Sequence, residues 1–433
     1  MIMGKRRKAT RREILKGGIS LLLLAGCSKK GKKEPDNTFS KLPRLKKPSI
    51  VLIVLDTLRW DHVSWAGRLP EPYKNLTPNF DSLGRSGIFF QRAYANAPWT
   101  LPSHGSLFTG FGPHVHKLGH NAVVTDSNAL AVKGNYSLVG RFRTMASVLR
   151  ELGYQTLGIS QNPWVGPLTT LDYGFDHFYA LWDQNSLPFP PRKGEDLKIE
   201  KVTYACRYFL RKVSDGRRPL FLFVNYITCH LPYQPAWPFR RRFVPGFPPD
   251  YLLDMTSHNW LLLQQEGKLD SEAVDYLRKL YIAEVAEVDS YLGELLKLLE
   301  ERLGENLLVI VTSDHGECIG HHAFFDHQFN LFEDLLRVPL VLRHPALKGP
   351  KSIGSPVQLS DLFPTILGFL GQEGLYQKLG LPGKALPLEK EDKTQRPLFF
   401  LFRRGSRVLS QLRGKLPAER IKQLDKDLFG VIF

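Results

Sequence analysis

Short apolar runs alternate with helical patterns along the chain from Ser49 onward. The runs are nearly continuous and rich in β-branched and aromatic residues, which is typical of strands buried on both faces. They lie within residues 49–58, 154–162, 219–227, 306–317 and 338–345. Helical patterns, such as those at 144–153 and 286–301, lie between them. The pattern predicts an α/β fold with a mostly parallel sheet covered by helices.

Polar residues close several of these runs. They are Asp56, Asn162, His230, Asp314 and His315. In sheets of this kind, ligands bind beyond the carboxyl ends of the strands. We therefore expect these side chains to gather at one edge of the sheet.

Two stretches break the alternation, at residues 186–201 and 233–260. Both are rich in proline and aromatic residues, which predicts long loops over the active face. After about Gly371 the apolar periodicity weakens, with one further strand expected within residues 397–409. The sequence stops in an apolar run, which favours a C-terminal part (372–433) that is small or truncated.

The positive charge is concentrated at the N-terminus. The net charge of the 433 residues is +17, but residues 1–27 hold seven Lys or Arg against one acid, and residues 28–48 hold eight against two. The excess therefore indicates targeting rather than a nucleic-acid-binding face, and we expect no nucleic-acid partner.

Residues 1–27 resemble a twin-arginine export signal that ends in a bacterial lipobox. Arg11 and Arg12 precede an apolar stretch that is too short to span a bilayer, and the stretch ends at Cys27. This resemblance implies lipidation of Cys27 and a membrane-anchored protein of the bacterial envelope that faces the periplasm or the exterior. Residues 28–48 would then be a basic linker near anionic headgroups. The alternative is an uncleaved anchor with an incidental cysteine.

An aspartate that closes a buried strand needs hydrogen bonds, a cation or a proton. Asp56 is in that position, and Asp314-His315 adds a carboxylate and an imidazole at another strand end. The three side chains are suitable ligands for one divalent metal with an open position for an oxygen. On spacing alone, loop capping and surface hydrogen bonds explain them equally well.

Residues 97–110, APWTLPSHGSLFTG, predict a short helix whose N-terminus lies at Thr100. Unpaired N–H groups favour negative charge there. Thr100 is therefore either a helix cap or a nucleophile that also contacts the metal.

Five motifs together resemble the sulfatase branch of the alkaline phosphatase superfamily. They occur in family order at residues 50–67, 77–110, 311–322, 335–345 and 357–367. The resemblance covers residues 49–371 as one catalytic domain. It implies a three-layer α/β/α fold, a metal site and covalent chemistry on a sulfate or phosphate ester.

By position, the resemblance makes Asp56, Asp314 and His315 metal ligands and Thr100 the nucleophile and a further ligand. Thr57 stands where many family members have a second aspartate. Tyr226 stands where related phosphodiesterases begin the Asp-x-x-x-His element of a second metal site. We therefore expect one divalent ion, Mn²⁺, Ca²⁺ or Mg²⁺.

Three departures point away from the formylglycine route of true sulfatases. Threonine replaces the cysteine or serine and cannot yield that aldehyde, because its β-carbon already carries a methyl group. His104 replaces the arginine of the motif, and residues 161–164 lack the usual lysine. The departures agree with superfamily members that use threonine on phosphate diesters, such as phosphoglycerol and phosphoethanolamine transferases.

Three further residues are candidates for contact with the substrate. His230 lies in the family's H-x-P-Y stretch, and Asn162 is a candidate oxyanion contact. His327 stands where sulfatases place a lysine, and we assign it as a general acid to the leaving oxygen. A loop histidine and a turn residue are the plain alternatives for His230 and Asn162.

The leading hypothesis is an exported, metal-dependent hydrolase or transferase of phosphate (di)esters or sulfate esters with a covalent intermediate on Thr100. One alternative is a sulfatase without formylglycine. The other is a non-catalytic lipoprotein that binds an anionic glycan. The expected partners are an anionic ester substrate, on a glycan or lipid headgroup, and the membrane through the lipid anchor.

Overall fold

The computed structural model describes most of the chain after the N-terminal segment. The described residues are 39, 42–119, 123–126, 129–131, 137–183, 200–257, 259–388, 396–403 and 406–432. The proposed signal (1–27), with Cys27, lies outside them, as does most of the linker and most of the predicted loop at 186–201. Within the described part, no helix is both long enough and apolar enough to cross a membrane.

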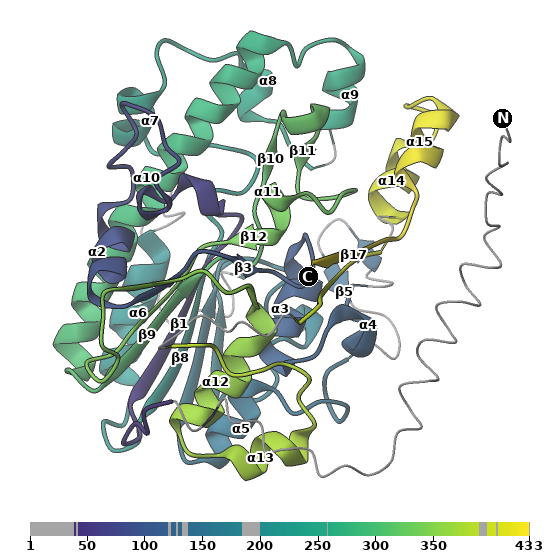
Figure 1. Cartoon of the computed structure of the whole chain (residues 1–433). Coiled ribbons are helices and arrows are strands. Elements are labelled where there is room, and N and C mark those ends of the chain that lie inside the picture. The colour runs from purple at the N-terminus through teal and green to yellow at the C-terminus, as the bar shows by residue number, and fades with distance from the viewer. Residues whose placement is uncertain are drawn as a thin grey trace, which may run out of the picture.

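An eight-stranded sheet forms the centre of the molecule (Figure 1). In spatial order its strands are β14 (Lys351–Ile353), β2 (Ile88–Phe90), β13 (Leu340–Arg343), β9 (Leu307–Thr312), β1 (Ser49–Leu55), β8 (Leu220–Tyr226), β6 (Gln155–Ser160) and β7 (His177–Ala180). All neighbours pair in parallel except for β13, which is antiparallel to both β9 and β2. The predicted mostly parallel sheet is confirmed.

Helices cover both faces of the sheet, as the side chains of β1 show. Val51, Ile53 and Leu55 pack in one apolar core with helices α2 (Pro78–Ser86), α6 (Glu200–Lys212) and α10 (Ser271–Leu303). Ile50, Leu52 and Val54 pack in a second core with helices α3 (Thr100–Thr109), α5 (Met145–Glu151) and α12 (Leu362–Phe369). Because successive strand residues point to opposite faces, β1 is apolar throughout. The three-layer α/β/α architecture follows.

Among the described residues, four small sheets lie outside the main one. They are β12–β3–β15 (Arg337–Val338, Ala93–Tyr94, Val357–Gln358), β10–β11 (Cys318–Ile319, Phe325–Asp326), β4–β5 (Val123–Asp126, Ala129–Ala131) and β16–β17 (Leu398–Phe402, Leu428–Ile432). The further strand expected within 397–409 is β16. Residues 430–432 of the final apolar run belong to β17, which pairs antiparallel with β16.

The stretch at 233–260 was predicted to be a loop, and this is wrong in part. It contains helices α7 (Trp237–Phe243) and α8 (Asp250–Leu253), and α9 (Trp260–Gln265) begins at its end. Proline at the second residue of α7 does not interrupt the helix, because the first N–H groups of a helix need no intrahelical partner. The remaining short helices are α4 (Pro113–His116), α11 (Glu333–Leu336), α13 (Glu373–Leu379), α14 (Ser406–Leu412) and α15 (Ala418–Leu424).

Candidate active site

Asp56 follows β1 directly and is fully buried. Its Oδ2 accepts a 2.6 Å hydrogen bond from Asn162 Nδ2, which comes from the segment after β6. Its Oδ1 is buried and has no hydrogen-bond partner. This oxygen is therefore available to a ligand.

Asp314 and His315 follow β9 and are also fully buried. Asp314 Oδ1 accepts from the backbone N–H groups of Thr57 (3.3 Å) and His315 (3.0 Å), whereas Oδ2 has no hydrogen-bond partner. His315 Nδ1 lies 2.9 Å from the Gly316 carbonyl, which can only accept, so Nδ1 carries the proton. In this tautomer the lone pair is on Nε2, the usual arrangement of a metal-binding histidine.

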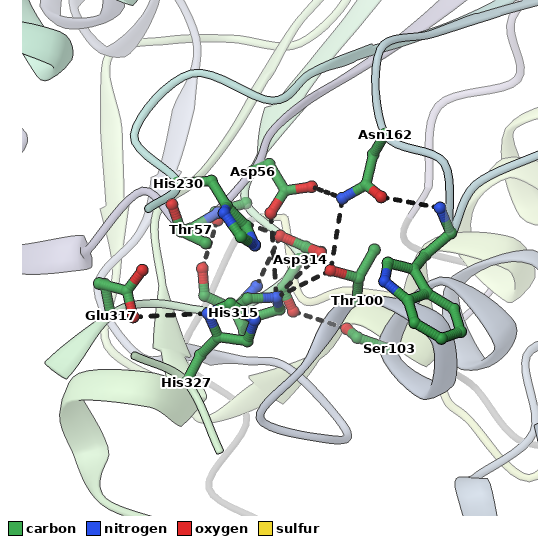
Figure 2. A network of polar contacts seen from close by, with 12 residues as sticks. Asp56, Thr57, Thr100, Ser103, Asn162, His230, Asp314, His315, Glu317 and His327 are labelled. Carbon is green, nitrogen blue, oxygen red and sulfur yellow. Dashed lines mark hydrogen bonds and ion pairs between the residues drawn. The ribbon is translucent and has the colours of Figure 1, made fainter. Parts of the chain in front are cut away.

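His315 Nε2 faces three oxygens. It lies 3.3 Å from Asp314 Oδ2, 3.3 Å from Thr100 Oγ1 and 3.9 Å from Asp56 Oδ1. Figure 2 shows these side chains converging on one point.

Thr100 is the first residue of α3 and is almost fully buried. The N-cap position belongs to Trp99, which makes no capping bond through its side chain. The Thr100 hydroxyl lies between Asn162 Nδ2, 3.5 Å away, and His315 Nε2 (Figure 2). One turn further along, Ser103 donates to the Asp314 carbonyl (2.6 Å), which fixes the helix against the segment after β9.

The electrostatics of Asp56, Asp314 and His315 fit a divalent cation. Burial and the Asp314 carboxylate raise the pKa of Asp56 to about 7. Burial also acts to raise the pKa of Asp314, but the His315 imidazole outweighs it and the pKa is lowered. Two buried carboxylates side by side, each with an unpaired oxygen, are stabilised by a positive charge between them.

Thr57 does not replace the missing second aspartate. Its hydroxyl donates to the Cys229 carbonyl and so is engaged elsewhere. The protein ligands available to a cation at this position are therefore Asp56, Asp314, His315 and the Thr100 hydroxyl.

His230 and His327 lie beside this triad. The His327 ring is 4.5 Å from that of His315 and 4.8 Å from that of His230, measured between ring centroids. Burial and the positive charge of His327 lower the pKa of His230 to about 4. For His327, burial acts to lower the pKa, but the carboxylates of Asp326 and Glu317 raise it well above its ordinary value.

Buried glutamates of α10 hold the loop that carries His230. Glu284 accepts from the backbone N–H groups of Cys229 (3.0 Å) and Gln234 (2.7 Å), and Glu287 accepts from that of Ala236 (2.9 Å). These two glutamates were not predicted from the sequence, because their pattern is that of an ordinary amphipathic helix.

A second cluster, also missed from the sequence, consists of Glu317, Asp326 and His327. All three are buried. The sequence did contain a local indication of this cluster. Glu317 comes two residues after His315, and Asp326 directly precedes His327.

The α/β/α fold, with carboxylates, a histidine and a hydroxyl at the carboxyl ends of its strands, is that of a hydrolase acting on sulfate or phosphate esters. The sulfatase family profile matches residues 48–372, and the chain therefore belongs to the sulfatase family. YidJ of Escherichia coli, an uncharacterised sulfatase, is 26% identical over 376 residues, which cover 81% of this chain and 72% of YidJ. Against three further curated sulfatases, the alignments span 62%, 61% and 65% of their length.

Two solved structures extend the likeness of fold. One is a protein in complex with its substrate D-glucosamine-2-N,6-O-disulfate, with a TM-score of 0.65 and 20% identity over 89% of this chain and 87% of that one. The other is the phosphonate monoester hydrolase of Agrobacterium radiobacter, with a TM-score of 0.61 and 21% identity over 89% and 85%. The fold thus occurs in proteins whose names refer to sulfate and to phosphonate substrates.

Proposed function

We propose that this protein cleaves phosphate esters, diesters above all, through a covalent ester on Thr100. The observation that carries the proposal is the position of the Thr100 hydroxyl. It is the first side chain of α3 and lies 3.3 Å from His315 Nε2, beside two carboxylates with unpaired oxygens. A hydroxyl at a helix N-terminus among such groups is suited to nucleophilic attack on an anionic ester.

A divalent cation held by Asp56, Asp314 and His315 would lower the pKa of the hydroxyl and offset charge on the ester. Thr100 loses its hydroxyl proton to water, and Oγ1 forms a bond to phosphorus as the bond to the leaving oxygen breaks. Asn162 Nδ2 donates a hydrogen bond to a non-bridging oxygen, and His327 gives a proton to the leaving oxygen. His230 holds its Nδ1 proton against the Leu231 carbonyl, so it would donate to the ester only in its protonated form, through Nε2. Water or an acceptor hydroxyl then attacks the phosphorus and frees Thr100.

The choice of phosphorus over sulfur rests on the nucleophile and its neighbours. Threonine yields no formylglycine. His104, where sulfatases have arginine, is buried, and its Nδ1 lies 3.0 Å from the Thr100 carbonyl. The likeness to a phosphonate monoester hydrolase supports phosphorus chemistry on this fold.

Sulfate-ester cleavage without formylglycine is the second candidate. It is favoured by membership of the sulfatase family and by the sulfated sugar bound in one structure of the same fold. The same residues would then act on sulfur, and the substrate would be a sulfated glycan.

The test is hydrolysis of bis-p-nitrophenyl phosphate and p-nitrophenyl sulfate by the purified protein with Mn²⁺. We expect diester cleavage that falls at least about 1000-fold in Thr100→Ala, because the nucleophile is lost. Thr109→Ala is the matched control, since Thr109 lies at the other end of α3 with its hydroxyl bonded to the Gly105 carbonyl. It should keep its activity.

The outcomes separate the candidates. Faster cleavage of the sulfate would replace the phosphate assignment. Turnover that persists in Thr100→Ala would remove Thr100 from the mechanism. A protein that binds Mn²⁺ but turns over neither ester would be the anionic-glycan-binding lipoprotein, and retention on immobilised heparin would support that function.

We further propose export to the bacterial envelope and anchorage by a lipid on Cys27. The support is the twin arginine, the short apolar stretch and the cysteine that ends it. A single mutation, Cys27→Ala, should move the protein from the membrane fraction to the soluble fraction on cell fractionation. A variant that stays with the membrane would show that the anchor is not a lipid on this cysteine.

A further inference from the structure

The Glu317–Asp326–His327 cluster has the composition and spacing of a metal site. Glu317 precedes β10, Asp326 ends β11, and the pairing of Cys318 with Asp326 holds the two segments together. One ligand atom from each of the three side chains lies within 4.8 Å of the others, as in the Asp56–Asp314–His315 triad. All three side chains are more than nine-tenths buried.

Three of the four carboxylate oxygens of this cluster lack a hydrogen-bond partner. Neither oxygen of Glu317 has one, nor does Asp326 Oδ2. Asp326 Oδ1 accepts from Ser257 Oγ (2.9 Å), which orients the carboxylate. His327 Nδ1 is the group that both carboxylates approach, at 2.9 Å from Asp326 Oδ1 and 3.4 Å from Glu317 Oε1 (Figure 2 shows the Glu317 contact).

A protonated His327 does not balance the charge of the cluster. With His327 positive and both carboxylates ionised, one buried negative charge is left. Arg59 donates to the Glu317 backbone carbonyl (2.7 Å), but its guanidinium pairs with Asp61 (2.8 Å) and Asp334 (3.2 Å). A buried net charge of this kind is costly unless a cation balances it.

We propose that Glu317, Asp326 and His327 bind a second divalent cation, next to the one expected at Asp56, Asp314 and His315. Two carboxylates with one imidazole suit Mn²⁺ or Zn²⁺, and three protein ligands leave positions open for water or substrate. The rings of His315 and His327 lie 4.5 Å apart, so the two sites are neighbours. The element in which Tyr226 replaces an aspartate, and which led us to expect one metal, lies elsewhere in the chain.

If a cation occupies this site, His327 can still contact the substrate, through its other ring nitrogen, Nε2. A cation on Nδ1 leaves the imidazole proton on Nε2, so His327 would then stabilise the leaving oxygen by a hydrogen bond and not by transfer of its proton. The inference depends neither on Thr100 nor on the choice between phosphate and sulfate, since it concerns only the buried charges of the cluster.

The test is the Mn²⁺ content of the full chain, stripped with chelator, dialysed against Mn²⁺ alone and measured by elemental analysis. We expect two ions per chain in the wild type and one in Glu317→Gln, in Asp326→Asn and in Asp314→Asn. Glu301→Gln, an exposed glutamate of α10, is the matched control and should keep two. A metal content that is the same in Glu317→Gln as in the wild type, whether one ion or two, would overturn the proposal.

Thermal unfolding separates metal binding from a purely structural ion pair. In chelator, Glu317→Gln should unfold at the wild-type temperature or above, because the substitution removes an uncompensated buried charge. Added Mn²⁺ should then raise the unfolding temperature of the wild type more than that of the variant. The opposite result is a variant that unfolds several degrees below the wild type in chelator and whose unfolding temperature rises as much with Mn²⁺. It would show that Glu317 serves only to hold a protonated His327.

Discussion

At the scale of the residue, backbone contacts orient the side chains at the strand ends. The Gly316 carbonyl fixes the tautomer of His315, and backbone N–H groups hold Asp314 Oδ1. Asn162 Oδ1 accepts from the Trp164 backbone N–H (2.8 Å), so the amide nitrogen is the atom that faces Asp56 and Thr100. Each group is thus oriented before any substrate arrives, which is the condition for electrostatic catalysis.

Asn162 allows the first prediction. Asn162→Ala removes the donor near Thr100 Oγ1 and leaves Asp56 Oδ2 without its hydrogen bond. We expect kcat for bis-p-nitrophenyl phosphate to fall about 100-fold while KM changes little, because the interaction matters most in the transition state. Steady-state kinetics with Mn²⁺ measure this.

The control for this prediction is Asn259→Ala. Asn259 also accepts a backbone N–H, that of Thr256 (2.7 Å), but lies beside α9. It should leave kcat unchanged. If Asn162→Ala raises KM and spares kcat, Asn162 contributes to substrate binding rather than to catalysis.

At the same scale, the sequence predicted which candidate residues follow a strand and missed those whose position depends on tertiary contacts. Asp56 and Asp314 follow apolar runs, and the carboxyl ends of parallel strands meet at one edge. Glu317, Asp326 and Glu284 lie in a hairpin and on a long helix, where acidic residues are usually exposed. Their burial results from packing between distant segments, which local pattern does not encode.

At the scale of the element, Arg59 ties the loop after β1 to two other segments. It is 1% exposed, and it bonds Asp61 in its own loop, the Glu317 carbonyl just before β10 and Asp334 within α11. Because Asp61 also contacts His62 Nδ1 (2.8 Å), the 3-10 helix η2 (Trp60–His62) joins the same network. The elements that carry Asp56 and Glu317 are held together by this one buried cation.

Asp61→Asn tests this network through the dependence of stability on pH. Burial acts to raise the pKa of Asp61, but the hydrogen bond from His62 and the Arg59 guanidinium lower it below the ordinary value of 3.8. The folded chain therefore binds fewer protons than the unfolded chain, so this stabilisation is present above pH 3.8 and is lost as the pH falls further. We expect the variant to lose about 2 kcal/mol of unfolding free energy at pH 7 and less as the pH falls below 3.8.

Urea unfolding between pH 7 and pH 3 checks this expectation. Asp275→Asn is the control, since Asp275 pairs with Lys279 at the surface (2.6 Å) and should cost less than about 0.5 kcal/mol. A deficit in Asp61→Asn that stays constant across this pH range would mean that the lost contact is not ionic.

At the scale of the whole molecule, the site exists only when the sheet is complete. Its side chains come from four separate segments: Asp56 follows β1, Thr100 begins α3, Asn162 follows β6 and Asp314 follows β9. The α/β class was predictable because strands buried on both faces are continuously apolar, whatever their neighbours. The reversed direction of β13 was not predictable, because an apolar run does not indicate the direction of its strand. The helices within 233–260 were not predictable either, because proline, which suggested a loop, is tolerated at a helix start.

Removal of metal is the prediction that belongs to this scale. A cation bound by residues from β1 and β9 stabilises only the folded chain, so its free energy of binding adds to the free energy of unfolding. At a free cation concentration of 100 times the dissociation constant, the free energy of unfolding rises by about 2.7 kcal/mol. This corresponds to an increase of roughly 3 to 8 °C in unfolding temperature. We expect chelator to lower the unfolding temperature of the wild type by that amount and Mn²⁺ to restore it. Asp56→Asn should respond less than the wild type, because one of the two repelling carboxylates is gone; an equal response would place the stabilising cation away from the strand ends.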